Sequence, residues 1–389
     1  MKILLASDMY ENQINGVSGS VITLRDELRK KGHDVRVLSL SKDKESKMVK
    51  TDYLIGSFSV PFYPDVRQTL KFRDPLIKDI IKWNPDIIHI QTEFSIHKIA
   101  KKIAKACKCP YVTTCHTFWE DYTGYLIPSK KIGKVLARKV VKHANKGSKA
   151  IIIPTEKMRG ILDGYGIKVD QFAIPTGIDL ARFQKKYTLS EKDAIRKKLN
   201  ISKNAKILIS LGRVAKEKNI DELIDFLPGL IKKDKDIILI IAGDGPYRKN
   251  IEDKVKELKL EEYVRFTGMV EPKNTYKYYA LGDVFVCSST SETQGITYIE
   301  AQACGTPLIC RYDKCLDNVL IDGENGYFFK NEEEFNKKVF KVLNDTKLRN
   351  TMRKKSLKLI DNFSKEKFGD KVEKLYIDVL KKAKEGSVK

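Results

Sequence analysis

The sequence predicts an α/β protein made of two doubly wound domains, each with a parallel sheet covered by helices on both faces. Three observations support this prediction. Short β-branched runs alternate with amphipathic helical segments from end to end, and this alternation restarts after a polar segment at 181–200. The length of 389 residues is too great for one ordinary core and suits two α/β domains. Strands that are apolar throughout are typical of sheets buried on both faces.

The first domain is predicted to span residues 1–185. Between its first two strands lies an amphipathic helical pattern, Ser20–Lys31, which Gly32 closes as a C-terminal cap. Its expected strands run over 2–7, 35–40, 86–91, 111–116, 150–154 and 172–175.

The second domain is predicted to span residues 186–362. Because open α/β sheets bind ligands at the carboxyl ends of their strands, we expect the two sheets to face a shared cleft. The segment from Glu332 to Lys382 has a purely helical pattern. The expected strands run over 207–211, 237–242, 264–266, 283–287 and 307–309.

Hydropathy and cysteine usage indicate a cytoplasmic protein. No apolar run approaches the roughly 20 residues that span a bilayer, and the start "MKILLASDMY" fits a first strand better than a signal peptide. The seven cysteines follow no disulfide or zinc spacing, the nearest two being Cys107 and Cys109. We therefore expect small buried thiols and no structural metal.

The charge balance is strongly basic. The 74 Lys and Arg residues against 51 Asp and Glu residues give a formal net charge of +23. Such a field attracts polyanions, so nucleic acid, an anionic membrane and phosphorylated substrates are all candidate partners. Basic residues are scattered over the helices without an aromatic single-strand platform, which argues against nucleic acid. A lysine-rich proteome is the plain alternative explanation.

The stretch "SETQGITYIEA" contains two carboxylates, Glu292 and Glu300, on either side of a glycine turn. Glu292 follows a strand, so we expect it in a loop, with a helix starting near Gly295. The amides of Gln294, Gly295 and Ile296 would then form a helix N-terminus that can hold a phosphate. A nucleotide-sugar has a matching layout, with sugar hydroxyls at one end, a diphosphate in the middle and ribose hydroxyls at the other.

Motifs along nearly the whole chain resemble those of the retaining GT-B glycosyltransferases of family 4, whose pattern includes a pair of glutamates eight residues apart. This resemblance implies two Rossmann-like domains facing a cleft, with a C-terminal helix at 363–389 that crosses back to the first domain. The matching segments are "NGVSGS", "TCHTFW", "IPTGID", "LGRVAKEKN", "IAGDGP", "FTGMV" and "SETQGITYIEA".

The resemblance implies a role for each second-domain residue. Arg213 and Lys218 would neutralise the two phosphates of the donor. Glu292 would bind hydroxyls of the donor sugar, and Glu300 would bind the ribose. These four residues and the amides at 294–296 would form the donor site.

Four further positions follow from the same resemblance. The backbone around Met269 and Val270 would hold the base, and Gly16 would let the main chain close over the diphosphate. His116 would reach the donor sugar near its anomeric carbon. Taken alone, His116 would more often be a hydrogen-bonded core histidine than a catalytic one.

The subgroup resemblance is to bacterial diacylglycerol glucosyltransferases, based on "SETQG", "TYIEA" and "HTFWEDYTGY". It implies transfer of glucose from UDP-glucose to diacylglycerol with retention, by a peripheral enzyme on the inner face of the cell membrane. The family commonly has an aromatic residue where this chain has Gln294. The alternatives are a family member with another acceptor, such as a phosphatidylinositol, a cell-wall polymer or a soluble metabolite, or a polyanion binder without catalysis.

No tightly bound cofactor is expected, and stimulation by Mg²⁺ is left open. The acidic pair Asp234 and Asp236 precedes a strand, so a turn explains it better than a metal site.

A basic amphipathic helix is predicted over Lys130–Lys146 as the membrane-docking segment. A projection at 100° per residue gathers most basic side chains on one half and the apolar residues 132, 133, 136, 137, 140 and 144 on the other, with Val135 and Val141 as exceptions. We expect the apolar half to pack on the sheet and the basic half to meet an anionic bilayer. The preceding aromatic residues, Phe118, Trp119, Tyr122 and Tyr125, are predicted to lie at headgroup level.

Overall fold

The computed structural model describes residues 1–11, 15–60, 63–117, 120, 129–185 and 187–386. The predicted aromatic segment at 118–125 lies outside these residues apart from residue 120. The chain forms two compact units, one made of Met1–Gly177 and Lys365–Lys389, the other of Ile178–Ser364. The division falls earlier than the predicted boundary at 185, because Ile178 and Phe183 are buried in the core of the second unit.

The first unit contains an eight-stranded sheet in the order β10-β9-β8-β7-β1-β2-β4-β3. All neighbouring strands are parallel except β3 and β4 at one edge. The strands are β1 (Lys2–Ala6), β2 (Asp34–Leu40), β3 (Lys47–Val49), β4 (Asp52–Ile55), β7 (Ile87–Ile90), β8 (Tyr111–Thr114), β9 (Ile151–Ile153) and β10 (Gln171–Ala173). Each of the six predicted strands is present. Sequence reasoning missed β3, β4 and the hairpin of β5 (Phe58–Val60) and β6 (Tyr63–Gln68).

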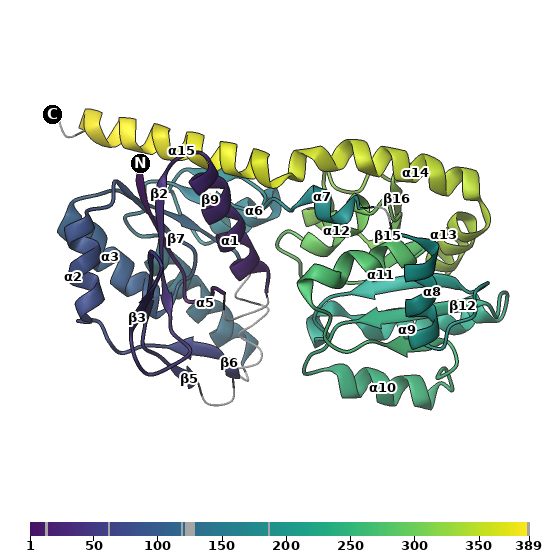
Figure 1. Cartoon of the computed structure of the whole chain (residues 1–389). Helices are drawn as coiled ribbons and strands as arrows, with labels where there is room; N and C mark the ends of the chain where they lie inside the picture. Colours follow the sequence, from purple (N-terminus) through teal and green to yellow (C-terminus); the bar gives the residue numbers. More distant parts are fainter. Residues whose placement is uncertain (12–14, 61–62, 118–119, 121–128, 186, 387–389) are drawn as a thin grey trace. The chain divides into compact units, whose positions relative to one another are not determined.

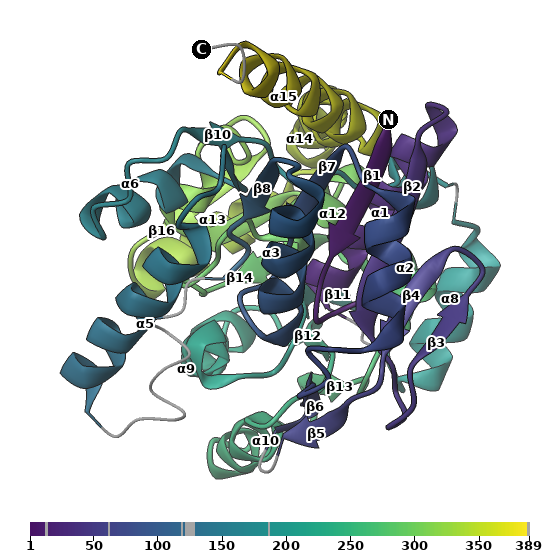
Figure 2. The same ribbon diagram turned by 90° about the vertical axis from the view of Figure 1, so that its left-hand side faces the viewer.

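Helices cover both faces of this sheet. In β1, Ile3 and Leu5 pack with α1 and α15, whereas Leu4 and Ala6 pack with α2 and α3. This alternation is the period of two expected of a strand buried on both sides. Figures 1 and 2 show α2 and α3 together on one side of the strands. The helices are α1 (Gly16–Lys30), α2 (Pro75–Trp83), α3 (Ser95–Cys107), α5 (Lys130–Asn145), α6 (Glu156–Gly164) and α15 (Lys365–Gly386).

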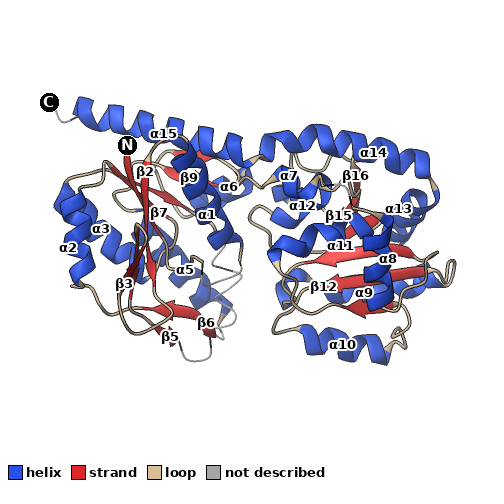
Figure 3. Cartoon of the chain, viewed as in Figure 1, coloured by secondary structure: helices blue, strands red, loops and turns tan. Residues whose placement is uncertain are grey.

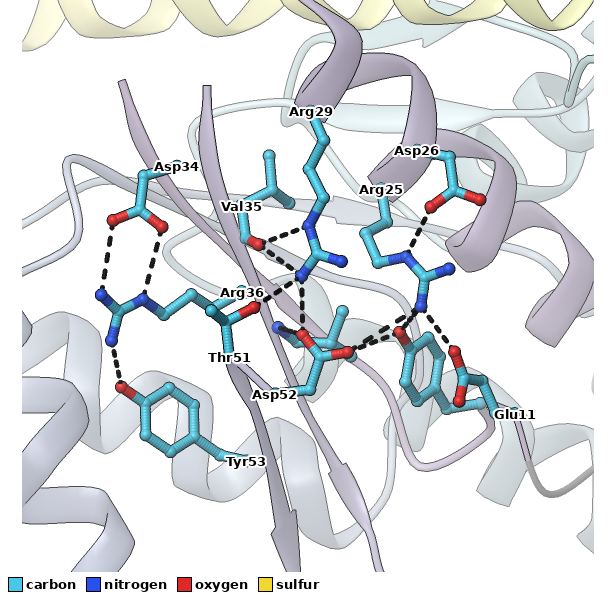
Figure 4. A network of polar contacts seen from close by, with 12 residues as sticks. Glu11, Arg25, Asp26, Arg29, Asp34, Val35, Arg36, Thr51, Asp52 and Tyr53 are labelled. Atoms are coloured by element: carbon cyan, nitrogen blue, oxygen red, sulfur yellow. Dashed lines mark hydrogen bonds and ion pairs between the residues drawn. The ribbon is translucent and has the colours of Figure 1, made fainter. Parts of the chain in front are cut away.

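A network of charged groups ties α1 to the sheet (Figure 4). Arg29 donates to the carbonyl of Val35 at 2.7 Å and to Asp52 Oδ1 at 2.8 Å. Asp52 is buried and also accepts the hydroxyl of Tyr10 at 2.8 Å. Arg25 contacts the same tyrosine and forms an ion pair with Glu11. These bonds fix α1, whose first turn carries Gly16, relative to β2 and β4.

The second unit contains a six-stranded, fully parallel sheet in the order β13-β12-β11-β14-β15-β16. In β11, Ile207 and Ile209 face α11 and α12, and Leu208 faces α9, α10 and α13. Figure 3 shows helices on both sides of these strands. The strands are β11 (Lys206–Leu211), β12 (Ile237–Ala242), β13 (Val264–Phe266), β14 (Val284–Cys287), β15 (Leu308–Arg311) and β16 (Gly326–Phe329).

The segment predicted as helical from residue 332 onward begins in the second unit, and its last part is α15 of the first unit. The helices of the second unit are α7 (Leu180–Phe183), α8 (Leu189–Lys198), α9 (Ile220–Ile231), α10 (Arg248–Glu257), α11 (Thr275–Leu281), α12 (Ile296–Ala303), α13 (Glu332–Asn344) and α14 (Thr346–Leu359). Short 3₁₀ turns lie at Lys216–Lys218, Pro272–Asn274, Lys314–Leu316 and Ile360–Phe363.

Both sheets have a point at which the strand order reverses. It lies between β1 and β7 in the first unit and between β11 and β14 in the second. The loops that follow these strands diverge at such a point, and open α/β sheets bind their ligands there. Among the described helices, none combines the length and the apolar character that crossing a bilayer requires.

Candidate active site

Two loops meet at the reversal point of the second sheet. β11 and β14 pair in parallel, so the loops at their carboxyl ends are neighbours. Lys218, after β11, places Nζ 2.6 Å from Oε1 of Glu292, after β14. Ser288 and Ser291 of the second loop donate to backbone carbonyls of Asn219 and Glu217 at 2.6 and 3.1 Å. The structure therefore brings two predicted site residues together as an ion pair between two loops that are also joined by hydrogen bonds.

Arg213 lies on the same loop, three residues before the 3₁₀ turn that contains Lys218. Its side chain is exposed and pairs with Glu217 at 2.6 Å. The motif "GDG" explains how this loop is supported. A Cβ on Gly243 would lie 1.9 Å from the carbonyl oxygen of Gly212, and one on Gly245 would lie 2.3 Å from that of Val214. The glycines thus allow the loop after β12 to pack directly on the loop that carries Arg213.

Helix α12 begins at Ile296 with Gly295 as its N-cap. Gly295 has φ +70°, and a Cβ there would lie 2.2 Å from the ring of Tyr298, so glycine is required on two grounds. The side chain of Gln294 is buried. The N-terminal amides of a helix lack intrahelical acceptors and carry the positive end of its dipole, so this turn suits an anion. It lies at the carboxyl end of β14, beside the loop with Lys218.

Glu300 lies within α12, so the two carboxylates of the motif come from different elements. Its Oε2 accepts the hydroxyl of Tyr279 at 2.8 Å, and Arg182 lies 3.7 Å from its Oε1. Burial raises the pKa of Glu300 to about 7, although the bond from Tyr279 and the charge of Arg182 act in the opposite direction. This carboxyl group can therefore change its protonation state near neutral pH.

Met269 and Val270 follow β13, two strands away from β11. The side chain of Met269 is 66% exposed, while Val270 packs against the core. Gly268 before them has φ +69° and accepts a hydrogen bond from the amide of Gly243 at 3.1 Å. Backbone groups at this position are thus held in register with the glycine-rich loops.

The other two predicted residues lie in the first unit. Gly16 is the first residue of α1 rather than part of the preceding loop, because Asn15 caps the helix by accepting the amide of Ser18 at 2.9 Å. His116 lies two residues beyond the end of β8, and its Nε2 is 2.7 Å from Oε1 of Gln91. Burial lowers the pKa of His116 to about 4, so the imidazole is neutral at physiological pH.

Sequence reasoning missed several residues that contact predicted ones, among them Gln91, Tyr279 and Arg182. Gln91 left a signal, because "IIHIQ" ends an otherwise apolar strand with polar side chains at alternate positions. Tyr279 and Arg182 are distant from Glu300 in sequence, and no local pattern relates them to it. A cluster of three or more His, Cys, Asp or Glu side chains suited to a metal ion is absent from the described ranges.

The strand order 3-2-1-4-5-6 of the second sheet, with a basic, glycine-containing loop and a helix N-terminus at its reversal point, is typical of nucleotide-binding α/β proteins. Comparison with known proteins narrows this class. Residues 191–359 match the model of glycosyl transferases group 1, and residues 14–182 match that of glycosyltransferase family 4.

Two relatives match almost the full chain. The alpha-monoglucosyldiacylglycerol synthase of Streptococcus pneumoniae is 34% identical over 385 residues, which is 98% of this chain and 86% of that protein. The enzyme of the same name from Acholeplasma laidlawii is 32% identical over 394 residues, 98% of each chain. The chain therefore belongs to the family 4 glycosyltransferases, and the protein is a glycosyltransferase, as its motifs predict.

Solved structures agree on the fold. Anabaena HepE in complex with UDP and glucose has a TM-score of 0.77 at 17% identity, covering 97% of this chain and 100% of that one. Sucrose-phosphate synthase from Thermosynechococcus elongatus has a TM-score of 0.75 at 19% identity, covering 97% and 99%. The predicted GT-B fold is confirmed.

Proposed function

We propose that this glycosyltransferase moves glucose from UDP-glucose to the free hydroxyl of diacylglycerol and forms alpha-monoglucosyldiacylglycerol with retention at the anomeric carbon. The observation that carries this proposal is the near-complete match to two enzymes named for that product. The ion pair of Lys218 and Glu292 beside the N-terminus of α12 supports it, because it sets a cation and a hydroxyl acceptor next to an anion-binding turn.

In the proposed donor complex, Arg213, Lys218 and the amides at 294–296, at the N-terminus of α12, contact the diphosphate. Glu292 accepts hydroxyls of the glucose, and Glu300 accepts those of the ribose. The uracil rests on the backbone at Met269 and Val270, while Gly16 lets the main chain of α1 approach the phosphates. A carboxylate accepts two hydroxyl hydrogens at once, which suits vicinal diols.

The reaction that we propose needs no enzyme-bound intermediate. The acceptor oxygen forms its bond to C1 of the glucose on the face from which the phosphate oxygen departs, and the leaving UDP takes the proton of the acceptor. Negative charge develops on that phosphate, so the side chains of Arg213 and Lys218 stabilise the transition state. His116, neutral at physiological pH, acts as a hydrogen-bonding partner of the sugar rather than as a charged group.

The membrane is the proposed source of the acceptor, and α5 is the proposed docking segment. The structure corrects the predicted packing of this helix. Its buried face is made of the small residues at 133, 137 and 144 together with Val141, whereas Ile132 and Leu136 are 56% and 43% exposed. The projection failed because residues with small side chains, not the larger apolar ones, let the helix approach the sheet closely.

This correction strengthens the case for a lipid surface. Ile132, Leu136 and Val140 recur every four residues and therefore form one exposed apolar stripe. Exposed basic residues lie on the same helix at 131, 134, 138, 139 and 142. Of these, Lys139 lies beside the stripe, whereas the other four are turned toward the opposite side of the helix, where Lys134 pairs with Glu120 at 3.1 Å. An exposed apolar stripe on a basic helix is suited to shallow insertion between anionic headgroups, with cations at headgroup level. We propose that the enzyme binds the inner face of the cell membrane peripherally through this helix.

The experiment that tests the proposal is a matrix of substrates in liposomes. Radiolabelled UDP-glucose, UDP-galactose and GDP-mannose are each offered with diacylglycerol, monoglucosyldiacylglycerol or phosphatidylinositol. We expect one labelled lipid, from UDP-glucose and diacylglycerol, whose linkage is cleaved by an α-glucosidase. Transfer to another acceptor, with diacylglycerol inert, would assign the enzyme to a different lipid or metabolite. Binding of every polyanion without any transfer would contradict the catalytic assignment.

A further inference from the structure

A chain of polar side chains leads from the C-terminal helix to His116 inside the first unit. Tyr376 on α15 has its hydroxyl 2.6 Å from Nδ1 of His89 on β7. The Nε2 amide of Gln91 lies 3.1 Å from the same Nδ1, and the Oε1 of Gln91 lies 2.7 Å from Nε2 of His116. Nε2 of His89 lies 2.6 Å from the hydroxyl of Thr114.

The alternation of side chains in two paired strands produces this arrangement. His89 and Gln91 are two residues apart at the end of β7, so they share one face, and Thr114 and His116 do the same at the end of β8. That face is the one covered by α1 and α15, where apolar packing surrounds Tyr376. His89, Gln91 and Tyr376 are all at most 2% exposed.

The directions of these hydrogen bonds determine the tautomer of both rings. A carboxamide oxygen only accepts, so Nε2 of His116 carries the hydrogen that bonds to Gln91. A carboxamide nitrogen only donates, so Nδ1 of His89 is an acceptor and its Nε2 donates to Thr114. Tyr376 adds a second donor to Nδ1 of His89. The hydroxyls of Tyr376 and Thr114 can each donate or accept, so both fit this orientation of the Gln91 amide.

We propose that Gln91 is a positioning residue that holds His116 in the tautomer with the hydrogen on Nε2, so that Nδ1 is the acceptor this ring offers to a hydroxyl of the bound hexose. The inference rests on the proposed role of His116. His89 and Tyr376 act one step further away by orienting the amide, so the last helix of the chain contributes to the order of the site. Burial lowers the pKa of His89 to about 3 and keeps that ring neutral, as this role requires.

The tautomer is measured by ¹⁵N nuclear magnetic resonance of the ligand-free, full-length protein labelled at its five histidines. The spectrum of His116→Gln assigns the His116 signals. We expect the wild-type ring to have a protonated Nε2 and an unprotonated Nδ1. Gln91→Leu removes the acceptor of that hydrogen and should shift His116 to a mixture of tautomers. Gln91→Glu accepts the same hydrogen with a full negative charge and should raise the pKa of His116 by about one unit or more.

Thr113→Val is the matched control. Thr113 is the neighbour of Thr114 on β8, is buried, and donates to Asn145 rather than to the histidine pair. Its loss costs a buried hydrogen bond without touching His116, so the His116 signals should stay unchanged. If Gln91→Leu does not fold, the wild-type tautomer and the titration of His116 in Gln91→Glu still test the proposal. A wild-type Nδ1–H tautomer, or a His116 pKa that Gln91→Glu leaves in place, would overturn the proposal.

Kinetics separate this inference from the proposed function. Gln91→Leu should lower kcat about tenfold to a hundredfold, with a smaller change in KM for UDP-glucose. This is the range of loss in metal sites when the residue that orients a ligating histidine is removed. Gln91→Glu should retain more turnover than Gln91→Leu near neutral pH. If His116→Gln is as active as wild type, the role of His116 fails and the positioning role with it. If His116→Gln is inactive but Gln91→Leu is not, only the positioning role is refuted.

Discussion

Lys218 and Glu292 form an ion pair of 2.6 Å that joins the loops after β11 and β14. Both side chains are largely shielded from solvent, at 24% and 16% exposure, so the pair is screened less than a surface salt bridge. The two groups have been assigned to different parts of the donor, the phosphate and the sugar. Their contact implies that each one sets the position and the effective charge of the other.

The first prediction follows from this coupling. Lys218→Met and Glu292→Gln should each lower kcat/KM by about two to three orders of magnitude, the usual loss for one electrostatic group. The double variant should lose much less than the product of the two effects, because the second change removes a partner that is already displaced. A double-mutant cycle on steady-state kinetics measures this coupling. Strictly multiplicative losses would show that the pair does not act as a unit.

The second prediction concerns Arg213. Arg213→Ala should lower kcat by about two to three orders of magnitude while the melting temperature changes little, because the side chain is exposed. Lys216→Ala is the matched control, since Lys216 is an exposed cation on the same loop. It should keep wild-type turnover. Equal turnover in both variants would remove Arg213 from the site.

The third prediction separates the two carboxylates of the motif by their effect on nucleotide binding. Glu300→Gln should strongly weaken the affinity for UDP, whereas Glu292→Gln should change that affinity less, through Lys218 alone, and should mainly lower the rate of sugar transfer. Isothermal titration with UDP and a transfer assay measure the two effects. If both variants lose UDP affinity equally, the assignment of Glu292 and Glu300 to opposite ends of the donor is wrong.

The fourth prediction uses the raised pKa of Glu300. Since the folded pKa of about 7 lies above the ordinary glutamate value of 4.5, the folded state holds a proton that the unfolded chain has released between these pH values. The contribution of Glu300 to the free energy of unfolding should therefore fall by on the order of 1–3 kcal/mol as pH rises through this window. Urea unfolding of the wild type and of Glu300→Gln should show this difference, and a constant difference would contradict the titration.

The same titration predicts the pH dependence of donor affinity. If the ribose hydroxyls donate to the Glu300 carboxylate, affinity for UDP-glucose should rise as pH passes about 7 and then level off. Tyr279→Phe removes a bond that lowers the pKa of Glu300, so the midpoint of this rise should move to higher pH. UDP-glucose is the suitable probe because its diphosphate does not titrate here. If the midpoint does not move in Tyr279→Phe, a group other than Glu300 controls the pH dependence of UDP-glucose affinity.

The fold was largely predictable because buried parallel strands are apolar runs that need no tertiary information. The strand β3 was missed for the opposite reason, since Lys47–Val49 is a short, exposed edge strand. The strand from residue 111 was predicted to extend to His116 but ends at Thr114, so His116 lies in the loop beyond the strand. Strand ends depend on pairing partners, which the local sequence does not specify.

The contacts within the candidate site were predictable only where its residues are close in sequence. Glu292, Gly295 and Glu300 share one loop and helix, so their spacing carried the information. Partners such as Tyr279 and Gln91 depend on which elements the fold brings together. The prediction of which face of α5 is exposed was wrong for a related reason. A helical projection identifies two faces but does not show which one packs against the protein.

The last prediction tests the membrane surface on α5. Binding to liposomes should rise with anionic lipid content and fall with salt, since exposed cations interact through a screened field. Glu substitutions at Lys131, Lys134, Arg138 and Lys142 should abolish sedimentation with the liposomes and leave UDP affinity unchanged. The charge-matched control places Glu at four exposed lysines of α13 and α14, Lys337, Lys347, Lys354 and Lys358, and should sediment as wild type.

The apolar stripe on α5 gives a second, independent arm of this test. Serine at Ile132, Leu136 and Val140 preserves the charge of the helix but removes the side chains that would enter the lipid, so binding should weaken several-fold at every salt concentration. Because these side chains are 56%, 43% and 44% exposed, the melting temperature should change little. If this triple variant and the quadruple charge variant both sediment like wild type, α5 is not the docking surface, and the net charge of +23 must act elsewhere on the protein.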